Sequence, residues 1–351
     1  MRWRGVGLVG AKALGVLRSV VLAWLLVPDD FGLFAVALLP LDAFLCATDV
    51  GMLPALVQAP KIDRGDYDVA WTIGIARAVL VGAALLMAAP LAATLLGDPR
   101  ATRIIQLVAL RPLLAALSSM RLAELQRALQ FRALALVDLA TAAAQTTLTI
   151  ALAHSFGVWA MALGMLGGTL AGVVVSYWQA PYVPKWAFDR PRALALLRFG
   201  RWLLLGSAVA MIGDAILIAA ITRSAGTAAL GRYSLAASIA LTPAAMIGSL
   251  ISGVAFAAHA RVASDPLRRA RVFRSSLVAM LVLIAPAYAI LMALAPALVA
   301  QGLDHRWNDI APVIRILACA GILGLVFDCS TALPLLDAFR SNAGLFWKIR
   351  A

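Results

Sequence analysis

Long apolar runs recur along almost the whole chain, and they restrict its fold more than any other feature. A helix needs roughly 20 apolar residues to cross the hydrocarbon core of a bilayer. Hydrophobic residues make up 63% of the 351 residues and charged residues only 13%, whereas a soluble domain carries about 25% charged residues. The sequence therefore predicts an all-α polytopic membrane protein with about ten transmembrane helices. The predicted spans are residues 6–27, 32–55, 69–96, 101–120, 133–153, 157–178, 200–222, 233–257, 276–300 and 309–333.

The positive charges are distributed unevenly between the connections. With the amino terminus placed inside, 20 of the 30 Lys and Arg residues fall in inside segments and 5 in outside segments. Cytoplasmic loops collect Lys and Arg, so this asymmetry predicts that both termini are cytoplasmic. The same loops account for most of the net charge of +13. We therefore expect them to face anionic membrane lipids, and we expect no nucleic-acid partner.

The connections differ in length as well as in charge. The outside turns are short, for example residues 27–30 and 154–157, and leave no room for an extracytoplasmic catalytic domain. One longer inside loop opens with Ser264-Asp265-Pro266 and continues into a basic run over residues 268–274. Proline in the first turn favours a helix start, so we expect an interfacial helix on anionic lipid there.

The chain resembles itself at an offset of about 200 residues. Residues 30–35 open the second predicted span and residues 229–234 open the eighth, with a glycine at the same place in each. Each span is followed by a basic inside loop, another span and a short turn, at residues 97–100 and 302–305. The orientation is the same in both copies, which is typical of the parallel repeats of transporters.

This repeat predicts two lobes. The first, residues 1–182, would hold six transmembrane helices, and the second, residues 195–351, only four. The second lobe is thus expected to be incomplete, either by design or because the chain is truncated at its carboxyl end. We favour truncation.

Three stretches also carry a resemblance to a known family. They are Leu25–Gly32, with its Pro-Asp-Asp-Phe-Gly turn, residues 49–58, and residues 130–138 continuing to Gly157-Val158-Trp159-Ala160. In their order and spacing they resemble the Wzx-type oligosaccharide and polysaccharide flippases, most closely those of the colanic-acid exporter type. That group belongs to the multidrug/oligosaccharidyl-lipid/polysaccharide (MOP) exporter superfamily. Its members have twelve or more spans, so ten spans depart from the family pattern.

The resemblance implies a fold and a function. It implies two helical lobes around a central cavity that opens alternately to each side of the bacterial cytoplasmic (inner) membrane. It implies an oligosaccharide on undecaprenyl diphosphate as the substrate, in the biosynthesis of surface polysaccharide. Polysaccharide assembly machinery is a further partner that would fit this role.

Several Lys and Arg side chains lie within the predicted spans, where a charge is costly unless it is paired or hydrated. Guanidinium groups stay charged and can hold two phosphate oxygens at once. A diphosphate-linked sugar chain needs such a path, so we expect these cations to bind the substrate. The alternative is ion pairing that holds helices together, for example between Arg18 and Asp42. The candidate substrate-binding residues are Lys12, Arg18, Arg77 and Arg111.

Acidic residues in the spans are the second group of candidates. Asp42, Asp138 and Asp214 could couple transport to protons or sodium. The alternative is that each is a counter-ion for a buried arginine. Gly164, Gly168 and Gly172 are different, because their four-residue spacing is typical of a helix-packing seam.

Motifs for other chemistry are absent from the sequence. There is no phosphate-binding G-x-x-x-x-G-K-[ST] loop, and Glu124 is the only glutamate. Cys46, Cys319 and Cys329 lack metal-ligand spacing. We expect no cofactor, no metal and no catalytic residue. The alternatives that remain are a cation-coupled small-molecule antiporter, a non-transporting remnant and, least favoured, an enzyme acting on the lipid-linked sugar.

Overall fold

A computed structural model describes most of the chain. It covers residues 2–48, 53, 56–57, 63–189, 211–246 and 266–324. Within these ranges the regular structure is helical and no strand occurs. The chain divides into two compact units, Met1–Ser234 and Leu235–Ala351. The boundary predicted between residues 182 and 195 lies partly outside the described residues, so the two lobes stay a prediction.

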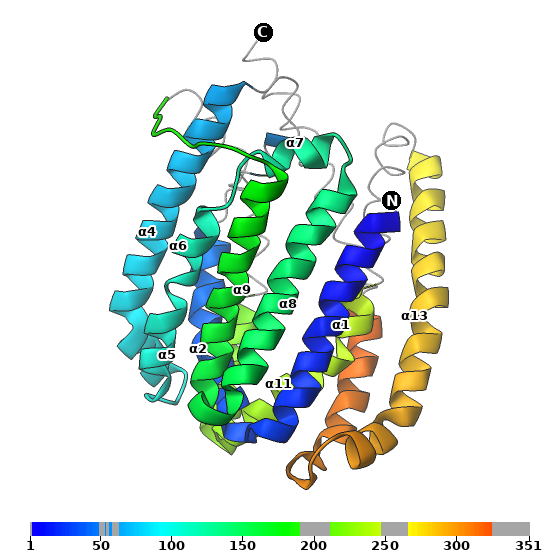
Figure 1. Cartoon of the computed structure of the whole chain (residues 1–351). Helices are drawn as coiled ribbons and strands as arrows, with labels where there is room; N and C mark the ends of the chain where they lie inside the picture. Colours follow the sequence, from blue (N-terminus) through cyan, green and yellow to red (C-terminus); the bar gives the residue numbers. More distant parts are fainter. Residues whose placement is uncertain are drawn as a thin grey trace. The chain divides into compact units, whose positions relative to one another are not determined.

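The first unit is a bundle of helices (Figure 1). Within it α8 packs against both α1 and α9, while α2 and α4 both pack against α5. Residues 211–225 are helical as well, and α11 begins two residues later. The helices are α1 (Arg2–Leu25), α2 (Pro28–Thr48), α4 (Arg64–Leu95), α5 (Ala101–Val108), α6 (Arg111–Ala116), α7 (Leu122–Arg127), α8 (Phe131–Phe156), α9 (Val158–Gln179) and α11 (Thr227–Ala240).

The second unit contains α13 (Pro266–Gly302), the short 3-10 helix η1 (His305–Trp307) and a helix over Ile310–Gly324. Pro296 lies inside α13 and has no backbone N–H to donate to the Met292 carbonyl four residues earlier. The Arg315 Nε atom takes that place and donates to the Met292 oxygen over 3.0 Å. An arginine from one helix thus completes the backbone hydrogen bonding of another.

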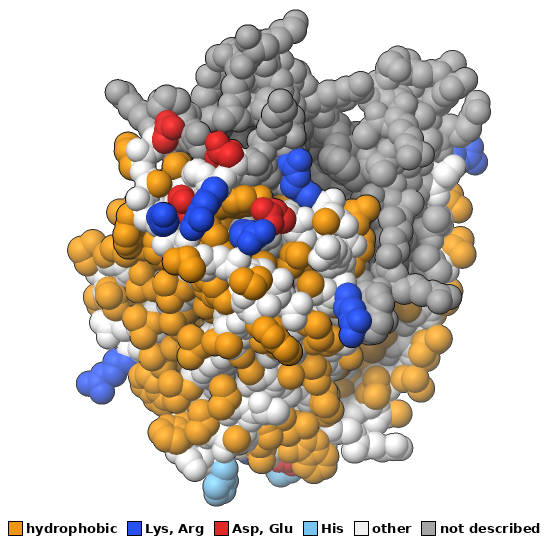
Figure 2. Space-filling view, turned by 45° about the horizontal axis from the view of Figure 1, so that its top comes forward, with side chains coloured by type: hydrophobic (Ala, Val, Ile, Leu, Met, Phe, Trp, Pro, Cys, Tyr) orange, Lys and Arg blue, Asp and Glu red, His pale blue; other side chains and the backbone are white. Residues whose placement is uncertain are grey.

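Six of the described helices are long and apolar enough to cross a membrane. Hydrophobic side chains cover much of the surface in Figure 2, and many of the charged ones gather toward one end. The predicted all-α membrane fold is therefore confirmed. The number of ten spans stays a prediction, because spans 200–222 and 233–257 lie partly outside the described residues. The six segments are Gly7–Leu25, Pro28–Thr48, Arg64–Leu95, Phe131–Phe156, Val158–Gln179 and Ile284–Gly302.

The fourth predicted span, residues 101–120, is not one continuous helix. It consists of α5 and α6, separated by a turn at residues 109–110. Pro112 is the reason, because its ring has no N–H for the Val108 carbonyl and clashes with the preceding turn. Proline is tolerated in the first turn of a helix, and Pro112 accordingly lies at the second residue of α6.

Two sequence features fix the long helix α4 and the α8–α9 pair. Asp63 and Asp66 form a capping box, so α4 begins five residues before the predicted span 69–96. Gly168 faces the Thr141 carbonyl and the Gln145 side chain so closely that a Cβ atom there would clash. The predicted glycine seam on α9 therefore packs against α8, as expected for helices in lipid.

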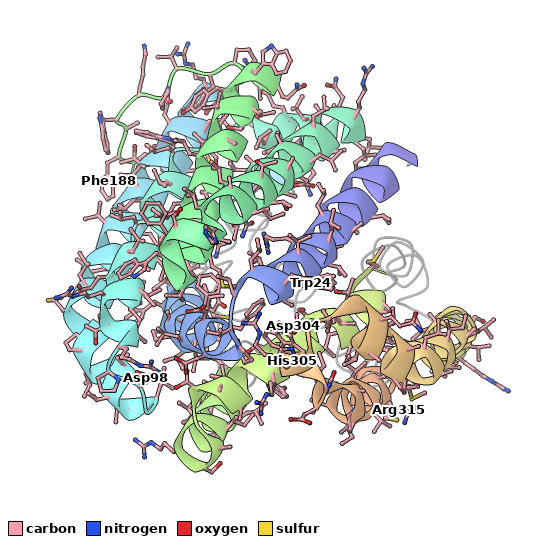
Figure 3. All side chains as sticks on the ribbon, turned by 60° about the horizontal axis from the view of Figure 1, so that its bottom comes forward. Trp24, Asp98, Phe188, Asp304, His305 and Arg315 are labelled. Atoms are coloured by element: carbon pink, nitrogen blue, oxygen red, sulfur yellow. The ribbon has the colours of Figure 1, made fainter. Side chains whose placement is uncertain are left out.

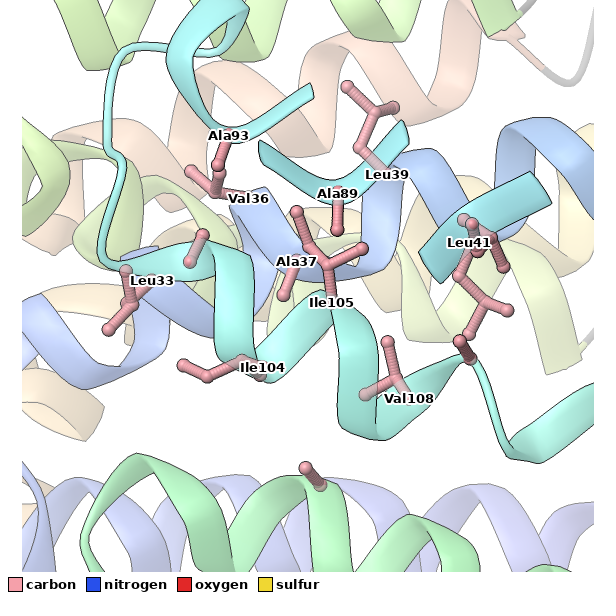
Figure 4. Close-up of a cluster of buried hydrophobic side chains, with 14 of the residues drawn as sticks. Leu33, Val36, Ala37, Leu39, Leu41, Ala89, Ala93, Ile104, Ile105 and Val108 are labelled. Atoms are coloured by element: carbon pink, nitrogen blue, oxygen red, sulfur yellow. The ribbon is translucent and has the colours of Figure 1, made fainter. Parts of the chain in front are cut away.

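The apolar core of the first unit lies between α2, α4 and α5. Figure 4 shows Leu33, Val36, Ala37, Leu39 and Leu41 of α2 meeting side chains of the other two helices, among them Ala89, Ala93, Ile104, Ile105 and Val108. Most of these side chains are fully buried. Because lipid is as apolar as leucine, close packing rather than removal from water holds these helices together.

Candidate functional site

The predicted cations on α1 differ in their surroundings. Lys12 is exposed, and Arg18 is half-buried. Arg18 has no hydrogen bond or ion pair to any residue in the described part of the chain. The alternative of an Arg18–Asp42 ion pair is therefore absent from the described structure. A half-buried guanidinium without a counter-ion keeps its donors available for an anionic ligand.

Arg77 of α4 has a backbone partner instead. Its Nη2 atom donates to the Leu45 carbonyl oxygen over 2.8 Å, and its Nε atom donates to Thr48 Oγ1 over 3.0 Å. Both acceptors lie in the last turn of α2, where carbonyl groups lack intrahelical donors and the helix dipole favours a cation. The geometry gives Arg77 a capping role at the end of α2, and its predicted role in substrate binding stays a prediction.

Asp42 lies within electrostatic range of two other predicted site residues in the first unit. Asp42 of α2 feels the charges of both Arg111 of α6 and Asp214 of the 211–225 helix. The hydroxyl of Tyr233 on α11 lies within electrostatic range of Asp214. We call Asp42, Arg111 and Asp214 the acidic group. Asp42 thus has one cationic and one acidic neighbour within electrostatic range, as a cation-coupling site would need.

Asp138, the third predicted acid, does not belong to the acidic group. It is exposed on α8 and is engaged by a neighbour. No group of three or more His, Cys, Asp or Glu side chains able to hold a metal ion occurs in the described ranges.

A polar cluster at the Leu95 end of α4 was not predicted. The Asp98 carboxylate is 5% exposed and accepts hydrogen bonds from Arg100 Nη2 (2.6 Å) and Thr227 Oγ1 (2.8 Å). Arg100 also pairs with Asp29 at the start of α2, over 2.8 Å. Arg223 Nη2 donates to the Leu95 carbonyl over 2.8 Å. The turn that follows α4 is thereby tied to residues more than 120 positions away.

Electrostatics keep the Asp98 carboxylate ionised. Burial alone would raise the pKa of this carboxyl, but hydrogen bonds from Arg100 and Thr227 outweigh burial and hold the pKa below its usual value. Hydrogen bonds to Asp98 and Asp29 likewise raise the pKa of Arg100. The turn after α13 repeats this geometry in the second unit, because Arg306 Nη2 lies 2.5 Å from Asp304 Oδ2. An Asp-x-Arg pair after α4 and after α13 was the sequence signal that could have revealed the cluster.

The segment after α9, residues 181–189, is not helical and runs along the Arg64 end of α4 (Figure 1). We call it the strap. The buried Asp68 carboxylate accepts the Tyr182 hydroxyl and the Lys185 backbone N–H, the latter over 3.0 Å. The Ala187 N–H donates to Thr72 Oγ1 over 3.1 Å. Burial and the bond to Asp68 raise the pKa of Tyr182.

Aromatic contacts and a shallow pocket complete the strap region. The Trp71 and Trp186 rings meet edge to face with centroids 5.0 Å apart. A pocket of about 460 Å³ lies beside the strap. It is lined by Asp63, Arg64, Tyr67, Arg121, Glu124, Pro181, Tyr182 and Val183. Positive and negative groups balance in this lining, so it has no preference for an anion.

Comparison with known proteins settles the family. The family model described as "Polysaccharide biosynthesis protein" matches residues 21–312. The chain belongs to this family. It is 28% identical, over 98% of its length and 70% of the relative's, to the succinoglycan biosynthesis transport protein ExoT of Rhizobium meliloti. It is 23% identical, over 92% of its length, to the lipopolysaccharide biosynthesis protein WzxC of Escherichia coli, of which it covers 66%.

Two solved structures share the fold of this family member. One is the lipid II flippase MurJ in an inward closed conformation, with a TM-score of 0.73, 12% identity, and coverage of 95% of this chain and 76% of that chain. The other is an inward-facing multidrug resistance MATE transporter of the MOP superfamily, with a TM-score of 0.70, 14% identity, and coverage of 92% and 80%. The predicted resemblance to the Wzx-type group is confirmed by the family match and these relatives, and the two solved structures show the same fold.

Proposed function

We propose that this protein moves a lipid-linked oligosaccharide across the bacterial cytoplasmic membrane during surface polysaccharide biosynthesis. The observation that carries this proposal is the family match over residues 21–312, together with relatives that are named as polysaccharide transport and biosynthesis proteins. The chain spans about two thirds of the length of these relatives. Undecaprenyl diphosphate is the lipid carrier that we propose.

The substrate path would use the cations of the first unit. Arg18 is our first candidate for the diphosphate, because its guanidinium is half-buried and has no protein partner among the described residues. A planar guanidinium can hold two oxygens of one phosphate. Arg111 is the second candidate, and Lys12 would add charge along α1. Arg77 is the weakest, because the end of α2 already occupies two of its donors.

The acidic group would couple substrate transport to the binding of a proton or a sodium ion. Asp42 and Asp214 lie close enough to act on the same charge, and a proton or sodium ion bound there would alter the field on Arg111. A change in the charge of Arg111's neighbours can strengthen or weaken its hold on an anion. Asp138, which lies on another helix, would have a supporting role.

We also propose an orientation in the membrane and partners for this protein. Both termini would lie in the cytoplasm, with basic loops against anionic lipids, and polysaccharide assembly machinery would be its partner. The relatives are named as transport and biosynthesis proteins, which favours transport over catalysis. The fold shared with a multidrug transporter keeps a cation-coupled small-molecule antiporter as the second candidate.

Complementation tests the function and the role of Arg18 together. A strain that lacks its own flippase would receive this chain, or a full-length relative carrying the same change, and surface polysaccharide and membrane protein level would be measured. Arg18→Ala should abolish polysaccharide export at a normal protein level, and Arg18→Lys should impair it partly, because lysine keeps the charge but loses the two-pronged geometry.

Arg103→Ala is the matched control, because Arg103 is an exposed arginine on α5 and its loss should change nothing. Normal export by a stable Arg18→Ala variant would remove Arg18 from the path. Drug resistance without polysaccharide export would favour the antiporter.

A further inference from the structure

The strap, residues 181–189, exposes three large apolar side chains. Val183, Trp186 and Phe188 are between 71% and 76% exposed, although the strap lies outside the helices that could cross a membrane. Figure 3 labels Phe188 at the outer edge of the first unit, where it points away from the helices. Neighbouring exposed apolar side chains of this size mark a surface that contacts a protein or a membrane. The strap therefore needs an apolar partner.

The exposed face of α9 leads directly to the strap. Leu170, Val174 and Trp178 are exposed and follow one another at four-residue spacing, so they lie on one face of the helix. Because α9 is long and apolar enough to span a membrane, this face is expected to contact lipid. The helix ends at Gln179, two residues before the strap begins. The apolar surface of the strap continues this lipid-facing surface.

Two tryptophans of α9 indicate where the membrane surfaces lie. Trp159 is in the first turn of the helix and Trp178 in the last, and their separation of 19 positions corresponds to roughly 28 Å along the helix axis. The hydrocarbon core of a bilayer is about 30 Å thick, and tryptophan collects at both of its surfaces. Trp178 is therefore expected at one membrane–water interface, on the predicted cytoplasmic side.

The strap stays close to this depth. The Trp186 ring meets Trp71 of α4 with centroids 5.0 Å apart, and the Lys185 backbone N–H donates to Asp68. Asp68 and Trp71 lie at the edge of the predicted span 69–96, where α4 would enter the lipid. The Lys185 side chain is exposed beside Trp186. A lysine at this place can reach lipid phosphates while the neighbouring ring stays between the headgroups and the acyl chains.

We propose that the strap is a membrane anchor, whose Val183, Trp186 and Phe188 side chains lie at the boundary between headgroups and acyl chains in the predicted cytoplasmic leaflet. Its partner is the phospholipid bilayer, and Lys185 pairs with lipid phosphate. The anchor does not depend on the proposed function, because it concerns how the chain lies in lipid and not what the chain transports.

Depth-dependent fluorescence quenching tests this placement. Phe188→Cys would be made in a chain whose three native cysteines are replaced by serine, labelled with bimane and reconstituted in vesicles of phosphatidylethanolamine and phosphatidylglycerol. The quenchers would be lipids with a spin label near the carbonyl end or near the methyl end of the acyl chain, and iodide on both sides of the vesicle. The carbonyl-end label should quench at least about twofold more than the methyl-end label, because an interfacial side chain lies near the acyl carbonyls. Iodide should quench weakly.

Three further positions calibrate the depth. Trp178→Cys should give the same ratio of quenching as Phe188→Cys. Leu170→Cys lies about 12 Å deeper along α9, so the methyl-end label should quench it more strongly. Arg64→Cys is the control on the water side, because Arg64 is exposed at the first residue of α4 and should be quenched mainly by iodide.

The other outcomes would overturn the proposal. Strong quenching of Phe188→Cys by iodide, with none by the lipid labels, would place the strap in water. Weak quenching by all three quenchers would mean that another protein or a second copy of the chain covers the strap. Val183→Cys is the second variant and should reproduce the result if Phe188→Cys folds poorly. Each variant should melt within a few degrees of the parent, since the replaced side chains are exposed.

Discussion

The two ends of α4 are held by different chemistry. At the Arg64 end the strap is fixed by a buried carboxylate that accepts a phenol and a backbone N–H, and by a Trp71–Trp186 ring contact. At the Leu95 end the turn is held by ionic and hydroxyl groups, and the Arg100 side chain is 59% exposed. Figure 3 labels Phe188 of the strap and Asp98 of the turn.

The two ends differ in how much of each attachment water can reach. The Asp68 carboxylate is buried, so water cannot readily replace it as the acceptor of the Tyr182 hydroxyl and the Lys185 N–H, and the strap is expected to be a permanent attachment. At the Leu95 end Asp98 and Thr227 are buried as well, but Arg100 is exposed, so water can replace the ion pair between Arg100 and Asp29. The Leu95 end therefore combines a buried hydrogen bond with an exposed and weaker ion pair.

The largest effect is expected from Asp68→Ala. This change leaves the Tyr182 hydroxyl and the Lys185 N–H without an acceptor, and each buried unsatisfied group costs about 1–3 kcal/mol. The melting temperature of the detergent-solubilised protein should fall clearly, and so should its level in the membrane. Asp63→Asn is the control, because asparagine caps a helix about as well as aspartate. A melting temperature equal to that of the parent would contradict a permanent attachment of the strap.

A smaller effect is expected from pH at the Leu95 end. Because the pKa of Asp98 is depressed in the folded protein, its contribution is present above the ordinary carboxyl range and is lost only as the pH falls through the lowered value. The groups that act on Asp98 are Arg100, Thr227 and, through Arg100, Asp29.

The rate of maleimide labelling of an Ala101→Cys variant, whose side chain is fully buried in the turn region after α4, should accordingly depend on pH as it does in an unfolded reference peptide between about pH 5.5 and 8. At lower pH the Asp98→Asn variant should show no further change in this rate, because asparagine does not titrate. A marked opening of the parent between pH 5.5 and 8 would show that some other group fastens this end.

The smallest effect is expected from Arg100→Gln. Exposed ion pairs contribute about 0–1 kcal/mol, and more than half of the Arg100 side chain is exposed. The melting temperature should therefore stay within a few degrees of the parent's, while Asp98 keeps its bond to Thr227. A loss as large as that of Asp68→Ala would remove the distinction between the two ends.

The helical membrane fold could be predicted from the sequence, because the length of an apolar run is a local property of the chain. The glycines at positions 32 and 231 were identified as equivalent, yet nothing in their order shows that they touch. The break in the fourth predicted span could have been predicted from Pro112, but the continuous apolar run favoured one unbroken helix. The capping box of Asp63 and Asp66 could also have been predicted, because it is a local sequence pattern.

Site geometry was harder to predict, because it depends on which helices meet. Asp42, Arg111 and Asp214 are far apart in the chain, and only the packing of α2 and α6 with the 211–225 helix brings their charges together. Arg77 had the sequence features of a substrate-binding cation, but the end of α2 lies beside it. Sequence identifies costly charges in a membrane, and tertiary structure decides whether a backbone group or a ligand satisfies them.

The contact between Arg315 and the Met292 carbonyl links two positions that look unrelated in the sequence. Pro296 creates an unfilled acceptor in α13, and Arg315 fills it from another helix. Losing the arginine alone strands a carbonyl in lipid, whereas losing both restores an ordinary helix with its own hydrogen bond. The two positions are therefore coupled in one direction: replacing Pro296 first restores the helix's own donor, whereas replacing Arg315 first leaves the Met292 carbonyl without one.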